Sequence, residues 1–214
     1  KIRKIKEYII NMEKRKLVVS TGNQHKVEEI KNILEGLSIE VVSKKDVGLG
    51  DLEVIEDGET LEENSLKKAK ALAERLDYMV LADDSGLFVD ILNGEPGVYS
   101  SRYAGEEGND KKNNNKLLEE LEDIPLKERN AKFKTVIVLI TEDKESTIVY
   151  GECKGKVGFE LKGKNGFGYD PLFTPDGYDK TFGELGEEIK NKISHRAKAL
   201  ENLKEALKNI LEVD

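Results

Sequence analysis

The chain has 214 residues and a formal net charge of -8, and 36% of its residues are charged. This length allows one sizeable domain, and the negative balance argues against a nucleic-acid coat, which needs a basic face. With one cysteine, no apolar run of membrane-spanning length and no signal-peptide pattern, the sequence predicts a soluble cytoplasmic protein without an internal disulfide.

The first predicted elements are a short apolar strand over residues 16–20, a glycine turn and a helix. A helix N-terminus exposes unpaired amide groups and the positive end of the helix dipole. We therefore expect an anion such as a phosphate at Thr21, Gly22 and Asn23, with Lys26 reaching back from the first turn of the helix. The spacing matches neither a P-loop nor a dinucleotide-binding motif. The apolar stripe of the helix is Val27, Ile30, Leu34 and Leu37.

A second strand over residues 38–43 is followed by an acidic loop at Glu56-Asp57-Gly58, which by itself is typical of solvated charge. The segment Thr60-Leu61-Glu62-Glu63 then forms a capping box, which predicts the start of a second helix. The predicted apolar face of that helix is Leu66, Ala69, Leu72, Ala73 and Leu76.

Next we expect two strands, near residues 78–83 and 86–90, with acidic residues where the first one ends. An apolar strand that ends in two carboxylates, a hydroxyl and a glycine is typical of a site for a hard cation beside phosphates. Since adjacent strand residues point to opposite faces, only one of Asp83 and Asp84 can aim into such a site. The other is expected to support it.

The second half of the chain predicts a polar helix near residues 110–122, rich in asparagine and lysine. Alternating apolar and polar residues over 130–141 and 145–157 then predict a long antiparallel hairpin, so the fold is expected to be α/β with a mixed sheet. The final helix has Leu200, Leu203, Leu207 and Ile210 as its core stripe.

A glycine- and aromatic-rich turn, Gly166 to Phe173, precedes a helix that opens with Ser194-His195-Arg196. Glycines allow close backbone approach, Phe167 offers a stacking face, and His195 and Arg196 offer hydrogen-bond donors for carbonyl oxygens. These features favour recognition of a flat ring. The alternative is a surface turn beside an ordinary helix start.

Five separated motifs together resemble the family of inosine/xanthosine triphosphate pyrophosphatases, the Ham1-like enzymes. The resemblance implies hydrolysis of ITP, dITP and XTP to the monophosphate and pyrophosphate, which removes them from the nucleotide pool. It also implies a long twisted mixed sheet flanked by helices, with two lobes around a central substrate cleft. We expect one two-lobed domain over residues 16–214 and an N-terminal extension of unassigned role over residues 1–15. The motifs are Thr21 to Lys26, Ala82 to Leu87, Pro96 to Gly105, Gly166 to Phe173 and Glu188 to Arg196.

The resemblance further implies residue roles. Asp84 and Lys26 would be catalytic, and Glu56 and Asp84 would bind Mg2+, with Mn2+ as the alternative ion. Lys68 either contacts phosphate or is an ordinary solvated lysine. The implied substrate-binding residues are Thr21, Gly22, Asn23, Lys26, Lys68, Ser85, Phe167, Gly168, Tyr169, Asp170, Lys190, His195 and Arg196.

The expected partner is a small-molecule nucleotide, with no nucleic-acid polymer and no membrane, and the resemblance implies a homodimer. The segment Pro96 to Tyr103 either lies at the dimer contact or packs onto its own lobe, with Arg102 facing the cleft. Two other functions stay open: a pyrophosphatase for other modified nucleoside triphosphates, and a nucleotide-binding regulator without hydrolysis.

Overall fold

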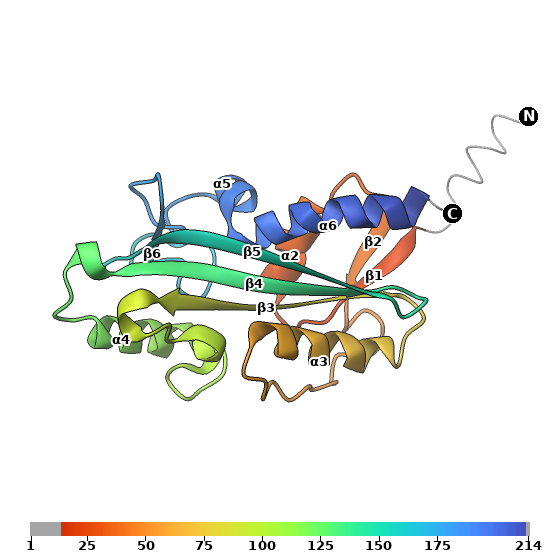
Figure 1. Ribbon diagram of the computed structural model, residues 1–214, viewed down its shortest axis with the longest axis horizontal. Coiled ribbons are helices and arrows are strands. Elements are labelled where there is room, and N and C mark those ends of the chain that lie inside the picture. Colours follow the sequence, from red (N-terminus) through yellow and green to blue (C-terminus); the bar gives the residue numbers. More distant parts are fainter. Residues whose placement is uncertain (1–13, 213–214) are drawn as a thin grey trace, which may run out of the picture.

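The computed structural model describes residues 14–212, and within them one mixed six-stranded sheet forms the centre of the molecule (Figure 1). The strands are β1 (Arg15–Val19), β2 (Ile39–Ser43), β3 (Met79–Val89), β4 (Asn130–Ile140), β5 (Ser146–Val157) and β6 (Phe173–Pro175). Their order across the sheet is β2-β1-β3-β4-β5-β6. β1 is parallel to β2 and β3, and the remaining neighbours are antiparallel. The predicted α/β class and mixed sheet are confirmed.

Helices cover both faces of the sheet, with α2, α5 and α6 on one side and α3 and α4 on the other (Figure 1). Their bounds are α2 (Gln24–Ile33), α3 (Leu61–Ala73), α4 (Asp110–Glu120), α5 (Glu187–Ile193) and α6 (His195–Glu212). Strand alternation fills both layers, because Leu17 and Val19 pack with α2 and α6 whereas Val18 packs with α3. None of the described helices is both long and apolar enough to cross a membrane.

The expectation of separate strands at 78–83 and 86–90 is wrong. β3 runs without a break from Met79 to Val89 and pairs with β4 from Val80 onward. Gly86 allows a close approach rather than a turn, since a Cβ there would lie 2.2 Å from the carbonyl oxygen of Gly97. The acidic residues Asp83 and Asp84 therefore lie within a strand and not at its end.

Several other boundaries differ from the expectations. α2 ends at Ile33, so Leu37 lies beyond the helix and packs against the core from the following turn. Neither β6 nor α5 was predicted, because both are short and lack a long periodic pattern. Residues 1–13, most of the predicted extension, lie outside the described residues, and β1 begins at Arg15.

Candidate active site

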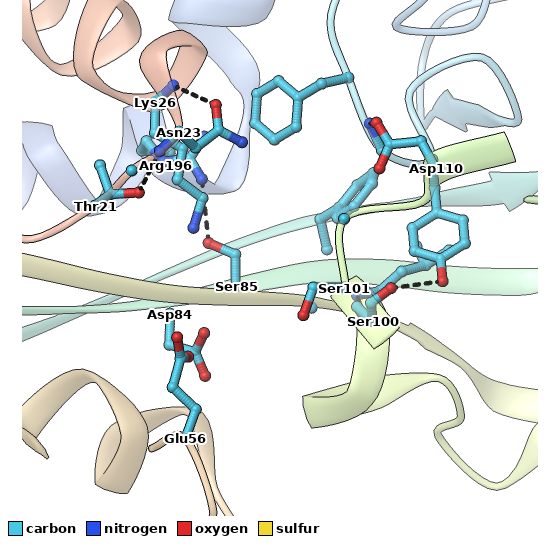
Figure 2. A pocket seen from close by; sticks show the side chains of 18 of the residues that line it. Thr21, Asn23, Lys26, Glu56, Asp84, Ser85, Ser100, Ser101, Asp110 and Arg196 are labelled. Carbon is cyan, nitrogen blue, oxygen red and sulfur yellow. Dashed lines mark hydrogen bonds between the residues drawn. The ribbon is translucent and has the colours of Figure 1, made fainter. Parts of the chain in front are cut away.

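A cavity of about 560 Å³ is lined by every residue to which the sequence assigned a catalytic, substrate-binding or metal-binding role. Its walls come from the N-terminal end of α2, the middle of β3, α3, the Gly166–Phe173 turn and the start of α6. Figure 2 shows Thr21, Asn23, Lys26 and Arg196 gathered on one side of the strand that carries Ser85, with Asp84 and Glu56 on the other side. The fold thus brings segments that are distant in sequence into one cleft.

The turn before α2 is ordered by its own polar side chains. Asn23 caps the helix, its Oδ1 accepting the Lys26 N–H at 3.3 Å, and Thr21 Oγ1 accepts the Asn23 N–H at 3.1 Å. At Gly22 an added Cβ would meet nothing within 4 Å, so the cavity is open at this turn. The structure therefore has a capped helix N-terminus beside the cavity, and anion binding there stays a prediction.

The two aspartates of β3 face opposite sides of the sheet and have different neighbours, as predicted from strand alternation. Asp83 Oδ2 lies 3.1 Å from Lys26 Nζ and 3.0 Å from Arg196 Nη2. Burial alone would raise the pKa of Asp83, but the charges of Lys26, Arg196 and Lys68 outweigh it and hold that pKa well below its usual value. Asp83 is thus an ionised counter-charge that supports two cations of the cavity.

On the other face of β3, Lys68 lies between two carboxylates. Its Nζ is 2.8 Å from Glu56 Oε2 and 3.2 Å from Asp84 Oδ1. Lys68 is only 9% exposed, which removes the alternative that it is an ordinary solvated lysine. Burial would lower its pKa, but Asp84 and Glu56 raise it above the usual value, so Lys68 is charged. Burial raises the pKa of Asp84, and Lys68 opposes that rise.

One carboxylate oxygen of Asp84 lacks a partner within residues 14–212. Its Oδ2 is buried and has no hydrogen-bond partner among the described residues. A buried carboxylate oxygen without a partner is costly unless another group satisfies it. Within residues 14–212, no group of three or more histidine, cysteine, aspartate or glutamate side chains is placed to hold a metal ion. Asp84 and Glu56 therefore offer a pair of carboxylates rather than a closed cage.

The far end of the cavity combines an aromatic ring with paired charges. Lys190 Nζ is 2.7 Å from both Asp170 Oδ2 and Glu29 Oε1, and it lies 4.5 Å from the centroid of the Phe167 ring. Arg196 forms an ion pair with Glu29 as well. Sequence reasoning missed Glu29; the available signal was its position one turn after Lys26, on the same face of α2.

His195 is buried and stacks on Phe133, with ring centroids 4.8 Å apart and an interplanar angle of 12°. Burial lowers the pKa of His195 well below 6.5, and Arg196 and Lys190 act in the same direction, so the imidazole is neutral. Its Nδ1 has no partner among the described residues. A neutral histidine can donate or accept a hydrogen bond, and this one lies at the wall of the cavity.

Comparison with known proteins identifies the family of the chain. The model of the Ham1 family matches residues 17–206. The chain belongs to the Ham1 family. A dITP/XTP pyrophosphatase from Clostridium perfringens is 50% identical over 203 residues, which is 92% of this chain and 99% of that protein. The Staphylococcus aureus Ham1 protein has a solved structure with a TM-score of 0.80 and 39% identity, covering 91% of this chain and 99% of that one.

A second solved Ham1 structure, from Coxiella burnetii, has a TM-score of 0.81 at 38% identity and covers 91% of this chain and 99% of that one. The family resemblance inferred from the five motifs is thus confirmed over nearly the whole chain. The residues matched by the family model, 17–206, include all those that line the cavity.

In this Ham1 fold the segment Pro96 to Tyr103 packs mainly against other elements of the same chain. Tyr103 is buried in the core and its hydroxyl lies 3.3 Å from Glu95, while Arg102 donates a hydrogen bond to the Glu56 carbonyl oxygen at 2.9 Å. Tyr99 differs, with 56% of its surface exposed. Tyr103 therefore packs within its own chain, and the hydrogen bond from Arg102 stabilises the loop that carries Glu56.

Proposed function

We propose that the chain hydrolyses dITP, XTP and ITP to the monophosphate and pyrophosphate. The observation that carries this proposal is the sharing of one cavity by an anion-binding turn, a lysine-bridged carboxylate pair and a cation-rich aromatic pocket. These three parts match the triphosphate, the reacting phosphorus and the base of one nucleotide. The high identity to proteins named dITP/XTP pyrophosphatase supports the same substrate class.

Asp84 and Glu56 fit a divalent ion, which we assign as Mg2+ with Mn2+ as the alternative. The Oδ2 of Asp84, which has no partner in the described part of the chain, would supply an oxygen ligand. Mg2+ in phosphate sites is commonly held by one or two carboxylates together with substrate phosphates, so a pair is sufficient. When bound, the ion neutralises phosphate charge and lowers the pKa of a water for attack.

The reaction places attack at the α-phosphorus, with pyrophosphate leaving. Thr21, Asn23 and the amides at the start of α2 bind phosphate oxygens, and Lys26 and Lys68 balance the charge that moves onto the leaving group. Asp84 accepts the proton of the attacking water. Its pKa, raised by burial, suits a general base better than that of an exposed aspartate.

The base pocket distinguishes purines at the 6-position. Phe167 stacks on the ring, and Arg196 and His195 direct donors at the 6-carbonyl of hypoxanthine or xanthine. Adenine carries an amino donor there, and each buried donor left without an acceptor costs about 1–3 kcal/mol. Several such mismatches reject ATP. Asp83 and Glu29 hold Arg196 in place by ion pairs.

A panel of nucleoside triphosphates tests the proposal. Pyrophosphate release is measured for dITP, XTP, ITP, ATP, GTP and modified pyrimidine nucleotides, with and without Mg2+. We expect rapid Mg2+-dependent release from the first three only. Orthophosphate as the product would place attack at the γ-phosphorus instead. A preference for pyrimidine nucleotides would favour a pyrophosphatase for other modified nucleoside triphosphates. Nucleotide binding without release of pyrophosphate would favour a nucleotide-binding regulator.

We also propose that the protein forms a two-fold homodimer in solution. The exposed Tyr99 is the aromatic residue of the Pro96–Tyr103 segment that remains available for such a contact. Light scattering should give twice the chain mass, and Tyr99→Ala should weaken association. A monomer at micromolar concentration would exclude the dimer, whereas an unchanged dimer in the variant would move the contact elsewhere.

A further inference from the structure

Gly168 lies beside Phe167 in the base pocket, and α4 holds its backbone from two sides. Asp110 Oδ2 accepts a hydrogen bond from Gly168 N–H at 2.7 Å, and Asn114 Nδ2 donates one to Gly168 C=O at 2.9 Å. Asp110 and Asn114 are four residues apart, so they lie on the same face of the helix. Together they fix the peptide planes before and after the Gly168 Cα.

This turn has little stiffness of its own. Gly166 and Gly168 have φ angles of 75° and 59°, in the left-handed region that glycine enters as easily as the right-handed one. A turn with glycine on both sides of Phe167 has many other conformations available. Phe167 N–H is held by Asp170 Oδ2 at 2.9 Å, and the bonds from α4 restrain the next residue.

The position of the Phe167 ring matters because it faces the cations of the pocket. Lys190 Nζ lies 4.5 Å from the ring centroid and Arg196 Cζ lies 5.8 Å from it. The ring of His25, on α2, is stacked with it at 5.8 Å between centroids. A shift of the Gly168 peptide would move this ring away from the groups that are set to read the base.

We propose that Asp110 and Asn114 are positioning residues for purine recognition, and that α4 sets the place of the Phe167 ring by fixing Gly168. This rests on the proposed function, since the assignment of Phe167 to the base is made there. Pre-ordering a binding group lowers the entropy lost when the ligand binds. Two of the polar side chains of α4 thereby have a role in the site.

Asp110 also lines the cavity, so direct electrostatic contact with the ligand is the competing explanation. Two substitutions separate the explanations. Asp110→Asn keeps an oxygen that can accept the Gly168 N–H but removes the charge, whereas Asp110→Ala removes both. If Asp110 acts by positioning the turn, Asp110→Asn should keep most of the affinity for the base and Asp110→Ala should lose it. If Asp110 acts through its charge on the ligand, both variants should change the affinity by the same factor.

The reaction products provide the binding test, because each occupies one part of the cavity. For Asp110→Ala we expect IMP to bind about tenfold more weakly by calorimetry, while the inhibition constant of pyrophosphate stays within about twofold of wild type. Asp110→Asn should lie close to wild type. Asn115→Ala, at an exposed position on the same helix, is the matched control and should change neither value. Equal weakening of both products in Asp110→Ala would overturn the proposal.

A second measurement needs no ligand. The chain has no tryptophan, so Phe167→Trp introduces a single tryptophan at residue 167, whose fluorescence can be excited apart from that of the seven tyrosines. Adding Asp110→Ala or Asn114→Asp should lower the fluorescence anisotropy of this reporter and increase its quenching by acrylamide, whereas adding Asn115→Ala should not. Asn114→Asp replaces the donor that faces the Gly168 carbonyl with an acceptor. Unchanged anisotropy in both double variants would overturn the positioning role.

These results separate the two proposals. A wild-type protein that neither releases pyrophosphate from dITP or XTP nor binds IMP contradicts the proposed function, and the reporter still shows whether α4 orders the turn. A wild type that does both, together with unchanged IMP binding in Asp110→Ala, contradicts the positioning role alone.

Discussion

We predict that changing each of the neighbouring aspartates of β3 to asparagine affects a different property, turnover in one case and stability in the other. Asp84→Asn should stop turnover and leave the fold intact, and Asp83→Asn should destabilise the fold. Asparagine is nearly isosteric with aspartate at both positions, so the difference between the two variants comes from the neighbours of each carboxylate. Asp83 is the counter-charge of Lys26 and Arg196, whereas Asp84 shares Lys68 with Glu56 and has one oxygen without a partner among the described residues.

The magnitudes follow from these contacts. Asp83 is 1% exposed, and its removal leaves Lys26 and Arg196 with less compensation in a buried site. Removing one partner of a buried ion pair costs about 3–5 kcal/mol of unfolding free energy. For Asp84, asparagine removes a carboxylate whose ionisation burial disfavours, and it also removes an attraction to Lys68. These effects oppose each other, so stability should stay within about 1 kcal/mol of wild type.

Turnover should fall far more in Asp84→Asn than in Asp83→Asn. In the proposed mechanism Asp84 is both the general base and a metal ligand, so its loss should raise the barrier by about 3 kcal/mol or more, which is a hundredfold or larger decrease in kcat. Urea unfolding followed by circular dichroism gives the stabilities, and pyrophosphate release from dITP gives kcat. Asp90→Asn, at a carboxylate whose side chain is 58% exposed, is the control and should change neither.

The low pKa of Asp83 adds a pH dependence to the same experiment. A carboxyl group with a depressed folded-state pKa contributes stability that is complete above its unfolded-state pKa, ordinarily 3.8, and is lost as pH falls towards the folded-state pKa. The difference in unfolding free energy between wild type and Asp83→Asn should therefore shrink below that pH. Near-normal turnover in Asp84→Asn, or wild-type stability in Asp83→Asn, would refute the reasoning.

Three further outcomes are expected. Burial raises the Asp84 pKa and Lys68 opposes that rise, so Lys68→Gln should move the acidic limb of the kcat/KM profile to higher pH; an unmoved limb would mean that Asp84 is not the base. His195 should remain neutral by nitrogen NMR from about pH 8 to about pH 6, and titration near 6.5 would contradict its buried environment. Arg129→Met should lower the unfolding free energy by about 3 kcal/mol, because the buried guanidinium donates to three backbone carbonyls, while KM for dITP stays unchanged.

Local features of the fold could be predicted from the sequence because their causes are local. Asn23 and Thr60 cap α2 and α3 through bonds to amides three residues away, and such caps are visible as residue spacing. The hairpin of β4 and β5 followed from alternation, and α6 begins at His195 where Ser194 Oγ accepts the Ala197 N–H at 3.1 Å. The sequence assignment named part of the cavity lining, whereas other lining residues, such as Phe133 and Asp110, were identified only in the structure.

Other features depended on contacts between distant residues, which spacing does not encode. Gly86 is typical of a turn in sequence, but the approach of Gly97 and pairing with β4 keep β3 continuous through it. Strand alternation predicted that Asp83 and Asp84 differ, yet which one is a counter-charge depends on Arg196, 113 residues further along. The pairing of Glu29 with Lys190 likewise spans 161 residues. Sequence determined which groups are available, and tertiary packing decided their neighbours and hence their charge states, because burial and nearby charges set each pKa.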